Sequence, residues 1–164
     1  MGLDMYLEAD KFVSIYQRKL QYDKLVDAVR EHMCTTPIPI AKNASSATLS
    51  IEVMYWRKAN AIHRWFVDNV QDGVDDCRRA FVSRENLVEL LDVCEKTLLA
   101  KADGNDPADY LPTRDVFLFG SIDYNEYFWD TIERTAVEVE RLLEWISREE
   151  EANNFWQIFY QSSW

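Results

Sequence analysis

The sequence has 164 residues, which is enough for one domain with a sizeable core, and we expect a single domain over 1–164. Hydrophobic residues make up 48% and aromatic residues 13%, which excludes an intrinsically disordered chain. The formal net charge of -11 repels nucleic acid, so we expect no nucleic-acid partner. No apolar run reaches the roughly 18 residues of a membrane span, so we expect no membrane partner either.

The cysteines indicate a reduced protein. Cys34, Cys77 and Cys94 are odd in number and form no CxxC pair, which is typical of free thiols in the cytoplasm. Only His32 and His63 add imidazole groups, and the spacing matches no zinc-ligand pattern. We therefore expect no metal site and no cofactor.

Hydrophobic periodicity predicts the first elements. Apolar and polar residues alternate over 2–9, which is typical of a strand with one buried face. Ser14 and Gln17 resemble a capping box, so a helix is expected from there to Met33. The proline-containing segment 35–47 is expected to be a loop.

A second strand is predicted over 47–56, and it runs almost directly into a helix over 57–71. Ile62, Phe66 and Val70 recur at the spacing of one helix face and predict its inward stripe.

A short strand is predicted at 78–83, with Ser83 as the N-cap of a third helix. The segment 101–112 is rich in helix breakers and is expected to be a loop. The predicted core face of the third helix consists of Leu87, Leu90, Leu91, Cys94 and Leu98.

A buried strand is predicted at 116–120, ending in Gly120. Asp123 and Glu126 suggest a capping box for a long fourth helix, and 154–163 predicts a last strand. The apolar face of the fourth helix is expected to consist of Phe128, Ile132, Thr135, Val139, Leu142 and Ile146.

The element order alternates strands with helices. Alternation alone would suit parallel βαβ units, but half-polar strands favour a sheet with one solvated face. We therefore predict an α+β domain with a mixed or antiparallel sheet of about five short strands and about four helices packed largely on one side.

A basic, aromatic stretch, "YWRKANAIHRWF", stands out because no acid lies between Glu52 and Asp68. It covers the predicted N-terminus of a helix, where free N–H groups and the dipole favour an anion. Guanidinium, amide and indole groups together suit a phosphate and a stacked base. The candidate ligand-binding residues here are Trp56, Arg57, Lys58, Asn60, His63 and Arg64.

Two simpler interpretations stay open for this stretch. Arg57 and Arg64 would serve equally as ion-pair partners of the acidic fourth helix. His63 on its own is more typical of a hydrogen-bonded structural histidine than of a base or a ligand.

A second cluster lies in "FGSIDYNEYF". Ser121 follows Gly120 where a strand is expected to give way to a helix, so its hydroxyl could meet an anion. Tyr124 and Tyr127 fall in the first turns and complete the candidate site. A helix cap and a turn packed with aromatic residues, without any binding role, would give the same sequence pattern. The two clusters form one site only if both strand-to-helix ends meet at one edge of the sheet.

The standard catalytic signatures are missing, including GxSxG, the P-loop, GxGxxG and HExxH. We therefore expect a binding protein rather than an enzyme, with no catalytic residues assigned. The least unfavourable alternative is acid–base chemistry by His63 with a nearby carboxylate.

The predicted helix over 123–151 carries ten acids against three arginines, a local net charge of -7. Such a face is a candidate for a basic partner, although most acidic faces are merely solvated.

The last residue, Trp164, occupies a position where chains usually fray. If it is ordered, it docks into this chain or into a neighbouring subunit. A homo-oligomer with a shared pocket therefore stays open.

The segments "MGLDMYL", "YWRKANAIHRWF", "VDNVQDG", "VSRENL", "FGSIDYNEYF" and "YQSSW" cover about half of the chain. In them the chain resembles a family of small proteins encoded by bacteriophages and prophages that has no established activity. The resemblance implies a phage accessory protein in the host bacterial cytoplasm, with an anti-defence role. We expect it to bind a small anionic, nucleotide-type ligand and so to sequester a host defence signal. The alternative is an acidic inhibitor that blocks a host defence protein through the 123–151 helix.

Overall fold

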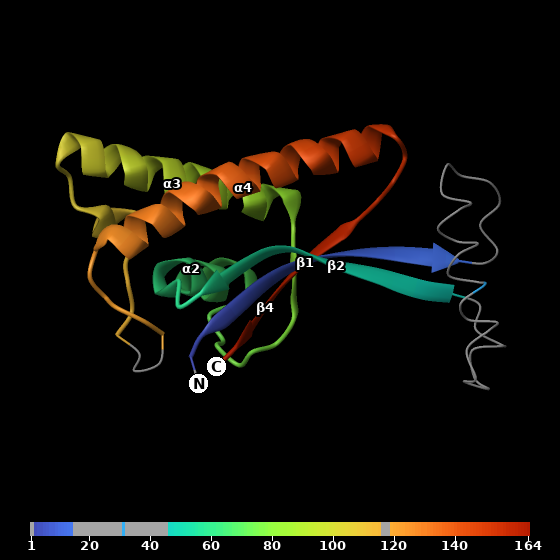
Figure 1. Cartoon of the computed structure of the whole chain (residues 1–164), viewed down its shortest axis with the longest axis horizontal. Coiled ribbons are helices and arrows are strands. Elements are labelled where there is room, and N and C mark those ends of the chain that lie inside the picture. The colour runs from blue at the N-terminus through green and yellow to red at the C-terminus, as the bar shows by residue number, and fades with distance from the viewer. Residues whose placement is uncertain (1, 15–30, 32–45, 116–118) are drawn as a thin grey trace. The chain divides into compact units, whose positions relative to one another are not determined.

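A computed structural model describes residues 2–14, 31, 46–115 and 119–164 (Figure 1). The helix predicted before Met33 and most of the loop predicted at 35–47 lie outside these residues, as do His32 and Cys34. The elements in chain order are β1 (Asp4–Ser14), β2 (Ser46–Arg57), α2 (Asn60–Val70), β3 (Ala80–Val82), α3 (Arg84–Asp103), the 3-10 turn η2 (Pro107–Asp109), α4 (Glu126–Glu151) and β4 (Gln157–Ser163).

The chain divides into two compact units. The first comprises Met1–Ala9 and Glu52–Trp164 and contains α2, α3, α4, β3 and β4. The second comprises Asp10–Ile51. Within the second unit the Ser50 hydroxyl donates to the Asp10 carboxylate at 2.6 Å. A single domain over 1–164 stays a prediction.

The four strands form one antiparallel sheet in the order β2-β1-β4-β3. β3 pairs with β4 in a register that places Phe81 opposite Phe159. The α+β class is therefore confirmed, and the sheet is antiparallel rather than mixed. The fifth strand predicted at 116–120 is not found: 116–118 lie outside the described residues, and neither Phe119 nor Gly120 belongs to a strand.

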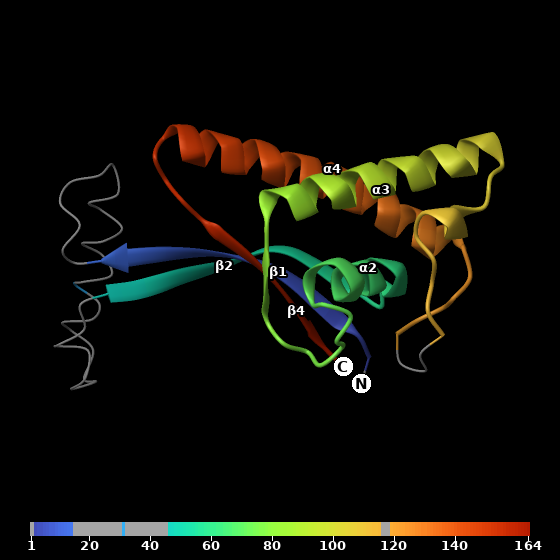
Figure 2. The same cartoon turned by 180° about the vertical axis from the view of Figure 1, so that it is seen from behind.

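The core of the first unit lies between the sheet and the helices (Figures 1 and 2). The Trp56 ring of β2 lies 5.9 Å from that of Phe66 in α2, and its indole N–H donates to the Thr135 hydroxyl of α4 at 2.8 Å. The Phe66 ring also stacks on Tyr160 of β4 at 4.0 Å. These contacts place α2 and α4 on the same face of the sheet, while α3 packs along α4 (Figure 2).

Most of the predicted core faces are confirmed, but Val70 of α2 and Leu91 and Leu98 of α3 are only partly buried. At the start of the chain, the alternation completely buries Leu3, which precedes β1, and Met5 and Leu7 within it. In α3, Cys94 is fully buried, and burial raises the pKa of its thiol to about 12, so it is an inert apolar side chain. All of the residues predicted for the apolar face of the fourth helix are buried, namely Phe128, Ile132, Thr135, Val139, Leu142 and Ile146.

The start of α4 differs from the prediction. Its N-cap is Asn125, whose side chain accepts from the Phe128 amide at 3.0 Å. Asp123 cannot serve as the cap because its carboxylate accepts from the Ser121 hydroxyl at 2.9 Å in the preceding turn. The predicted capping box of Asp123 and Glu126 is therefore wrong.

The N-cap predicted for α3 is confirmed. The Ser83 hydroxyl accepts from the Asn86 amide at 3.1 Å, and the Asn86 side chain accepts from the Ser83 amide at 3.1 Å. Two N–H groups that the helix itself cannot pair are thus satisfied. Gly104 ends the helix in the left-handed conformation.

We expect Ser83→Ala to lower the free energy of unfolding by about 1 kcal/mol, because the Asn86 amide loses its acceptor. Urea denaturation monitored by circular dichroism measures the change. Ser83→Asn keeps an acceptor at the N-cap and is the matched control, with an expected change near zero. Equal losses in the two variants would contradict the cap.

Candidate functional site

The junction between β2 and α2 lies later in the chain than predicted. β2 continues through Arg57. One residue after the end of β2, the Lys58 amide still donates a hydrogen bond to the carbonyl of Leu3, the residue before β1, at 2.7 Å. Lys58 then takes a φ of 54°, and α2 begins at Asn60. The predicted start of the helix at residue 57 is therefore wrong, because Arg57 belongs to the strand and not to the helix N-terminus.

A cavity of about 330 Å³, here called the junction cavity, lies beside this turn. Its walls come from the β2–α2 turn, from the segment 120–125 and from the first turns of α4. The two clusters recognised in the sequence thus meet at one place. Five of the predicted ligand-binding residues line the cavity: Arg57, Lys58, Asn60, Ser121 and Tyr127.

The exposed rim of the cavity carries its charges. Arg57 and Lys58 are exposed, and neither forms an ion pair with any residue that the structure describes. The Tyr127 hydroxyl donates to the Arg57 carbonyl and ties α4 to the end of β2. Ser121 and Asp123 form two hydrogen bonds with each other. The Ser121 hydroxyl donates to the Asp123 carboxylate at 2.9 Å and accepts from the Asp123 amide at 3.0 Å. The rim therefore offers one carboxylate and two cations that have no ion-pair partner in the described part of the chain.

The buried part of the cavity wall is mainly apolar. It includes Ala61, Ile62, Phe128 and Ile132. Thr131 is the exception: it is 6% exposed, and its hydroxyl has no hydrogen-bond partner among the residues the structure describes. Its oxygen is not among the fully buried unpaired atoms of the described residues, so the hydroxyl reaches the open space of the cavity, where it can form a hydrogen bond with a bound polar atom.

The N-terminus of α2 also borders the cavity. Its N-cap residue, Ala59, makes no side-chain capping bond, and the first turn contains no acid. By contrast, α3 has Ser83 and Glu85, and α4 has Asn125 and Glu126, at the corresponding positions. The first amides of α2 and its dipole thus lack the compensation that these two helices have.

Gly120 brings the segment 120–125 against the β2–α2 turn. Its φ is 101°, and a Cβ at this position would lie 2.8 Å from the Lys58 carbonyl oxygen. Only glycine permits both the backbone conformation and this approach.

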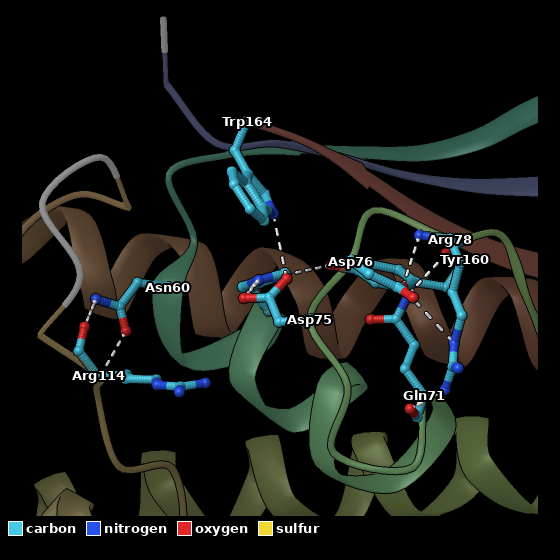
Figure 3. Close-up of polar contacts among 9 residues, drawn as sticks. Asn60, Gln71, Asp75, Asp76, Arg78, Arg114, Tyr160 and Trp164 are labelled. Carbon is cyan, nitrogen blue, oxygen red and sulfur yellow. Dashed lines mark hydrogen bonds and ion pairs between the residues drawn. The ribbon is translucent and has the colours of Figure 1, made fainter.

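Asn60 lines the cavity, but both ends of its side chain are engaged (Figure 3). Its amide nitrogen donates to the Arg114 carbonyl at 2.7 Å, and its oxygen accepts from the Arg114 amide at 2.8 Å. Asn60 therefore fixes the segment around Arg114 to α2. Its side chain helps to form the cavity wall, but its amide group is not available to a ligand.

Three other predicted residues lie away from the cavity. Trp56 is fully buried in the core. Arg64 pairs with Asp68 at 3.4 Å and lines a separate hollow of about 130 Å³. Tyr124 packs edge-on against Phe128, with ring centroids 4.8 Å apart.

The ninth predicted residue, His63, is buried in a polar network. It is 2% exposed, its Nε2 lies 3.1 Å from the Asp75 carboxylate, and its Nδ1 lies 2.7 Å from the Tyr160 hydroxyl. Because a carboxylate only accepts, the tautomer protonated at Nε2 satisfies both contacts, with Nδ1 accepting from Tyr160. The arrangement is that of a structural histidine.

Trp164 docks into its own chain. Its indole N–H donates to the Asp75 carboxylate at 3.2 Å (Figure 3), and its ring lies 5.8 Å from that of Phe119. Phe119 in turn meets His63 edge-on at 4.9 Å. The residue that precedes Gly120 is thus held between the histidine network and Trp164.

Sequence reasoning missed Thr131 and Asn125 as parts of the site. Thr131 lies next to Ile132 in the buried stripe of α4, where the sequence pattern does not distinguish a threonine from a core residue. A signal was available, because a hydroxyl inside an apolar stripe needs a partner, but the sequence does not show whether one exists.

Comparison with known protein families, with curated proteins and with solved structures gives no match. In the part of the chain that the structure describes, no helix is both long and apolar enough to cross a membrane. The same residues contain no cluster of three or more His, Cys, Asp or Glu side chains suited to a metal ion.

Burial lowers the pKa of His63 below its ordinary value of 6.5, and the neighbouring Asp75 carboxylate only partly opposes this shift. The unfolded chain therefore binds more protons than the folded chain below about pH 6.5. We expect the stability contributed by the neutral, buried His63 to be fully present above that pH and to be lost as the pH falls. Melting temperatures between pH 7.5 and 5.5 measure it.

Two variants separate the histidine from other titrating groups. His63→Asn should flatten the pH dependence, whereas Asp75→Asn should steepen it, because the charged imidazole loses its carboxylate. An unchanged pH dependence in His63→Asn would contradict the assignment.

We expect Gly120→Ala to lower the free energy of unfolding by about 1–3 kcal/mol, since it combines backbone strain with a clash against Lys58. Gly73→Ala is the matched control: its φ of 75° adds strain, but nothing lies within 4 Å of the new methyl group. Chemical denaturation should show the larger loss for Gly120→Ala. Equal losses would show that the close approach to Lys58 is unimportant.

Proposed function

We propose that this protein binds a small anionic ligand of the nucleotide type in the junction cavity. The observation that carries the proposal is the meeting of Arg57 and Lys58, both without ion-pair partners among the described residues, with the uncapped N-terminus of α2 at one cavity. Its volume of about 330 Å³ lies at the lower end of the range usual for small-molecule sites.

The electrostatics favour an anion in a chain whose net charge is -11. Most acids lie elsewhere, and Asp123 is the carboxylate that lines the cavity among the described residues. The N–H groups of Asn60, Ala61 and Ile62, which have no acceptor among the described residues, and the helix dipole add to the two side-chain cations. The combination suits a phosphate or carboxylate group at the rim.

The remaining lining suits the rest of such a ligand. Phe128 and Tyr127 provide aromatic surface, and Ile62 and Ile132 provide apolar contact. Cavities of this kind, mostly apolar with a few placed polar groups, bind organic ligands rather than bare ions. A base or a sugar attached to the phosphate would fill this part.

The bacteriophage resemblance gives the proposal its biological setting. An accessory protein in the host bacterial cytoplasm could hold a nucleotide signal and so remove it from a defence pathway. Such sequestration needs binding without turnover, which agrees with the lack of a catalytic motif in the sequence.

A second candidate function rests on α4. Several of its acids are exposed and form no ion pair within the described part of the chain: Asp130, Glu133, Glu140 and Glu144. Unpaired acids along one helix suit a basic partner, so the alternative is an inhibitor that blocks a host defence protein through this helix.

The test of ligand binding is a thermal-shift screen with inorganic phosphate and with mono-, cyclic and ADP-ribose-type nucleotides at fixed ionic strength. A ligand at a hundred times its Kd adds about 2.7 kcal/mol to the free energy of unfolding. We expect the double variant Arg57→Ala and Lys58→Ala to weaken binding by about 10- to 100-fold, since charge-assisted contacts are lost.

Arg64→Ala is the matched control, because Arg64 lies outside the junction cavity and pairs with Asp68. It should leave the shift unchanged. A ligand whose shift survives the double variant would contradict this site. No shift with any compound would favour the acidic α4 surface, which a pull-down with Glu140→Lys and Glu144→Lys then tests.

A further inference from the structure

The junction cavity is polarised between its rim and its buried wall. The charged side chains Arg57, Lys58 and Asp123 are all at exposed positions, whereas Ile62, Ile132 and Thr131 are buried. A ligand that fills the cavity therefore places its ionic group at the rim and its uncharged body against the wall.

We propose that the junction cavity selects nucleotides with one phosphate over the corresponding di- and triphosphates, and that Thr131 determines specificity by a hydrogen bond to the body of the ligand. The inference rests on the proposed function and narrows it to a class of ligand. It has two independent supports, the charge balance of the rim and the unpartnered hydroxyl of the wall.

The charge balance comes from three side chains. Arg57 and Lys58 contribute two positive charges and Asp123 one negative charge, which leaves one net positive charge beside the α2 dipole. The Asp123 carboxylate accepts from the Ser121 hydroxyl at 2.9 Å, and the Asp123 amide donates to the same hydroxyl at 3.0 Å, which favours this position of the carboxylate. One phosphate group matches this balance, whereas each additional phosphate brings more negative charge near the Asp123 carboxylate.

The hydroxyl of Thr131 is the group that we expect to form a hydrogen bond with the uncharged body of the ligand. It is the free polar side-chain group of the buried wall among the described residues, since the Asn60 amide is already engaged with Arg114. A hydroxyl both donates and accepts, so it can pair with one polar atom of a base or sugar. A ligand atom bonded there pairs a hydroxyl that reaches the cavity and has no hydrogen-bond partner among the described residues.

Calorimetric titration of the full chain with the mono-, di- and triphosphates of adenosine, guanosine, cytidine and uridine tests the proposal at fixed ionic strength. We expect the monophosphate of the preferred base to bind most tightly. Asp123→Asn should lower the preference for monophosphate over triphosphate about two- to fivefold, the effect of one exposed charge pair.

Thr131→Val removes the hydroxyl while keeping the shape of the side chain. It should weaken monophosphate binding about two- to tenfold, and Thr131→Ser should restore it. Thr97→Val is the matched control: Thr97 is fully buried in α3, its hydroxyl donates to the Val93 carbonyl, and it does not line the cavity. This control reports any loss that comes from stability alone.

The outcomes separate the two proposals. If no phosphate compound binds the unaltered chain, the proposed function itself fails. If affinity rises with the number of phosphates and neither Asp123→Asn nor Thr131→Val changes it selectively, the selectivity inference is overturned while anion binding stands.

Discussion

The hydrogen bond from the Lys58 amide to the Leu3 carbonyl sets the geometry on which the site depends. This bond holds the residue after β2 against the residue before β1. The turn into α2, which begins at Asn60, is therefore confined to Lys58 and Ala59. The N-cap residue, Ala59, has no polar side chain, so the first amides of α2 receive no side-chain cap. The same turn leaves Arg57 and Lys58 at the rim of the cavity rather than on the helix.

The opposite wall of the cavity is held by contacts between distant segments. Gly120 permits close approach to the Lys58 carbonyl, and the Tyr127 hydroxyl bonds to the Arg57 carbonyl. Farther along, Asn60 binds the backbone of Arg114 on both sides. Rigid walls of this kind favour binding, because less conformational entropy is lost when a ligand is held.

The distribution of charge explains how an acidic protein can offer an anion site. α4 carries many of the acids on its exposed side, whereas the stretch from Tyr55 to Phe66 contains none. Exposed charges farther apart than the Debye length, about 8 Å at physiological salt, are largely screened from one another. The local balance at the cavity, rather than the net charge, therefore decides which ligand is favoured, while the net charge still disfavours polyanions such as nucleic acid.

The sequence by itself determined the α+β class, the buried alternation of Leu3, Met5 and Leu7, the apolar face of α4 and the greater part of that of α3, because periodicity records which side of an element is buried. It also predicted Arg57, Lys58 and Ser121 as ligand contacts from residue type at a strand-to-helix turn; all three line the junction cavity, and ligand binding by them stays a prediction. Only the tertiary structure decided that His63 meets Asp75 and Tyr160, and that the Thr131 hydroxyl lines the cavity without a partner in the described part of the chain. Whether a polar group is paired or free depends on residues far away in the sequence, and periodicity carries no information about them.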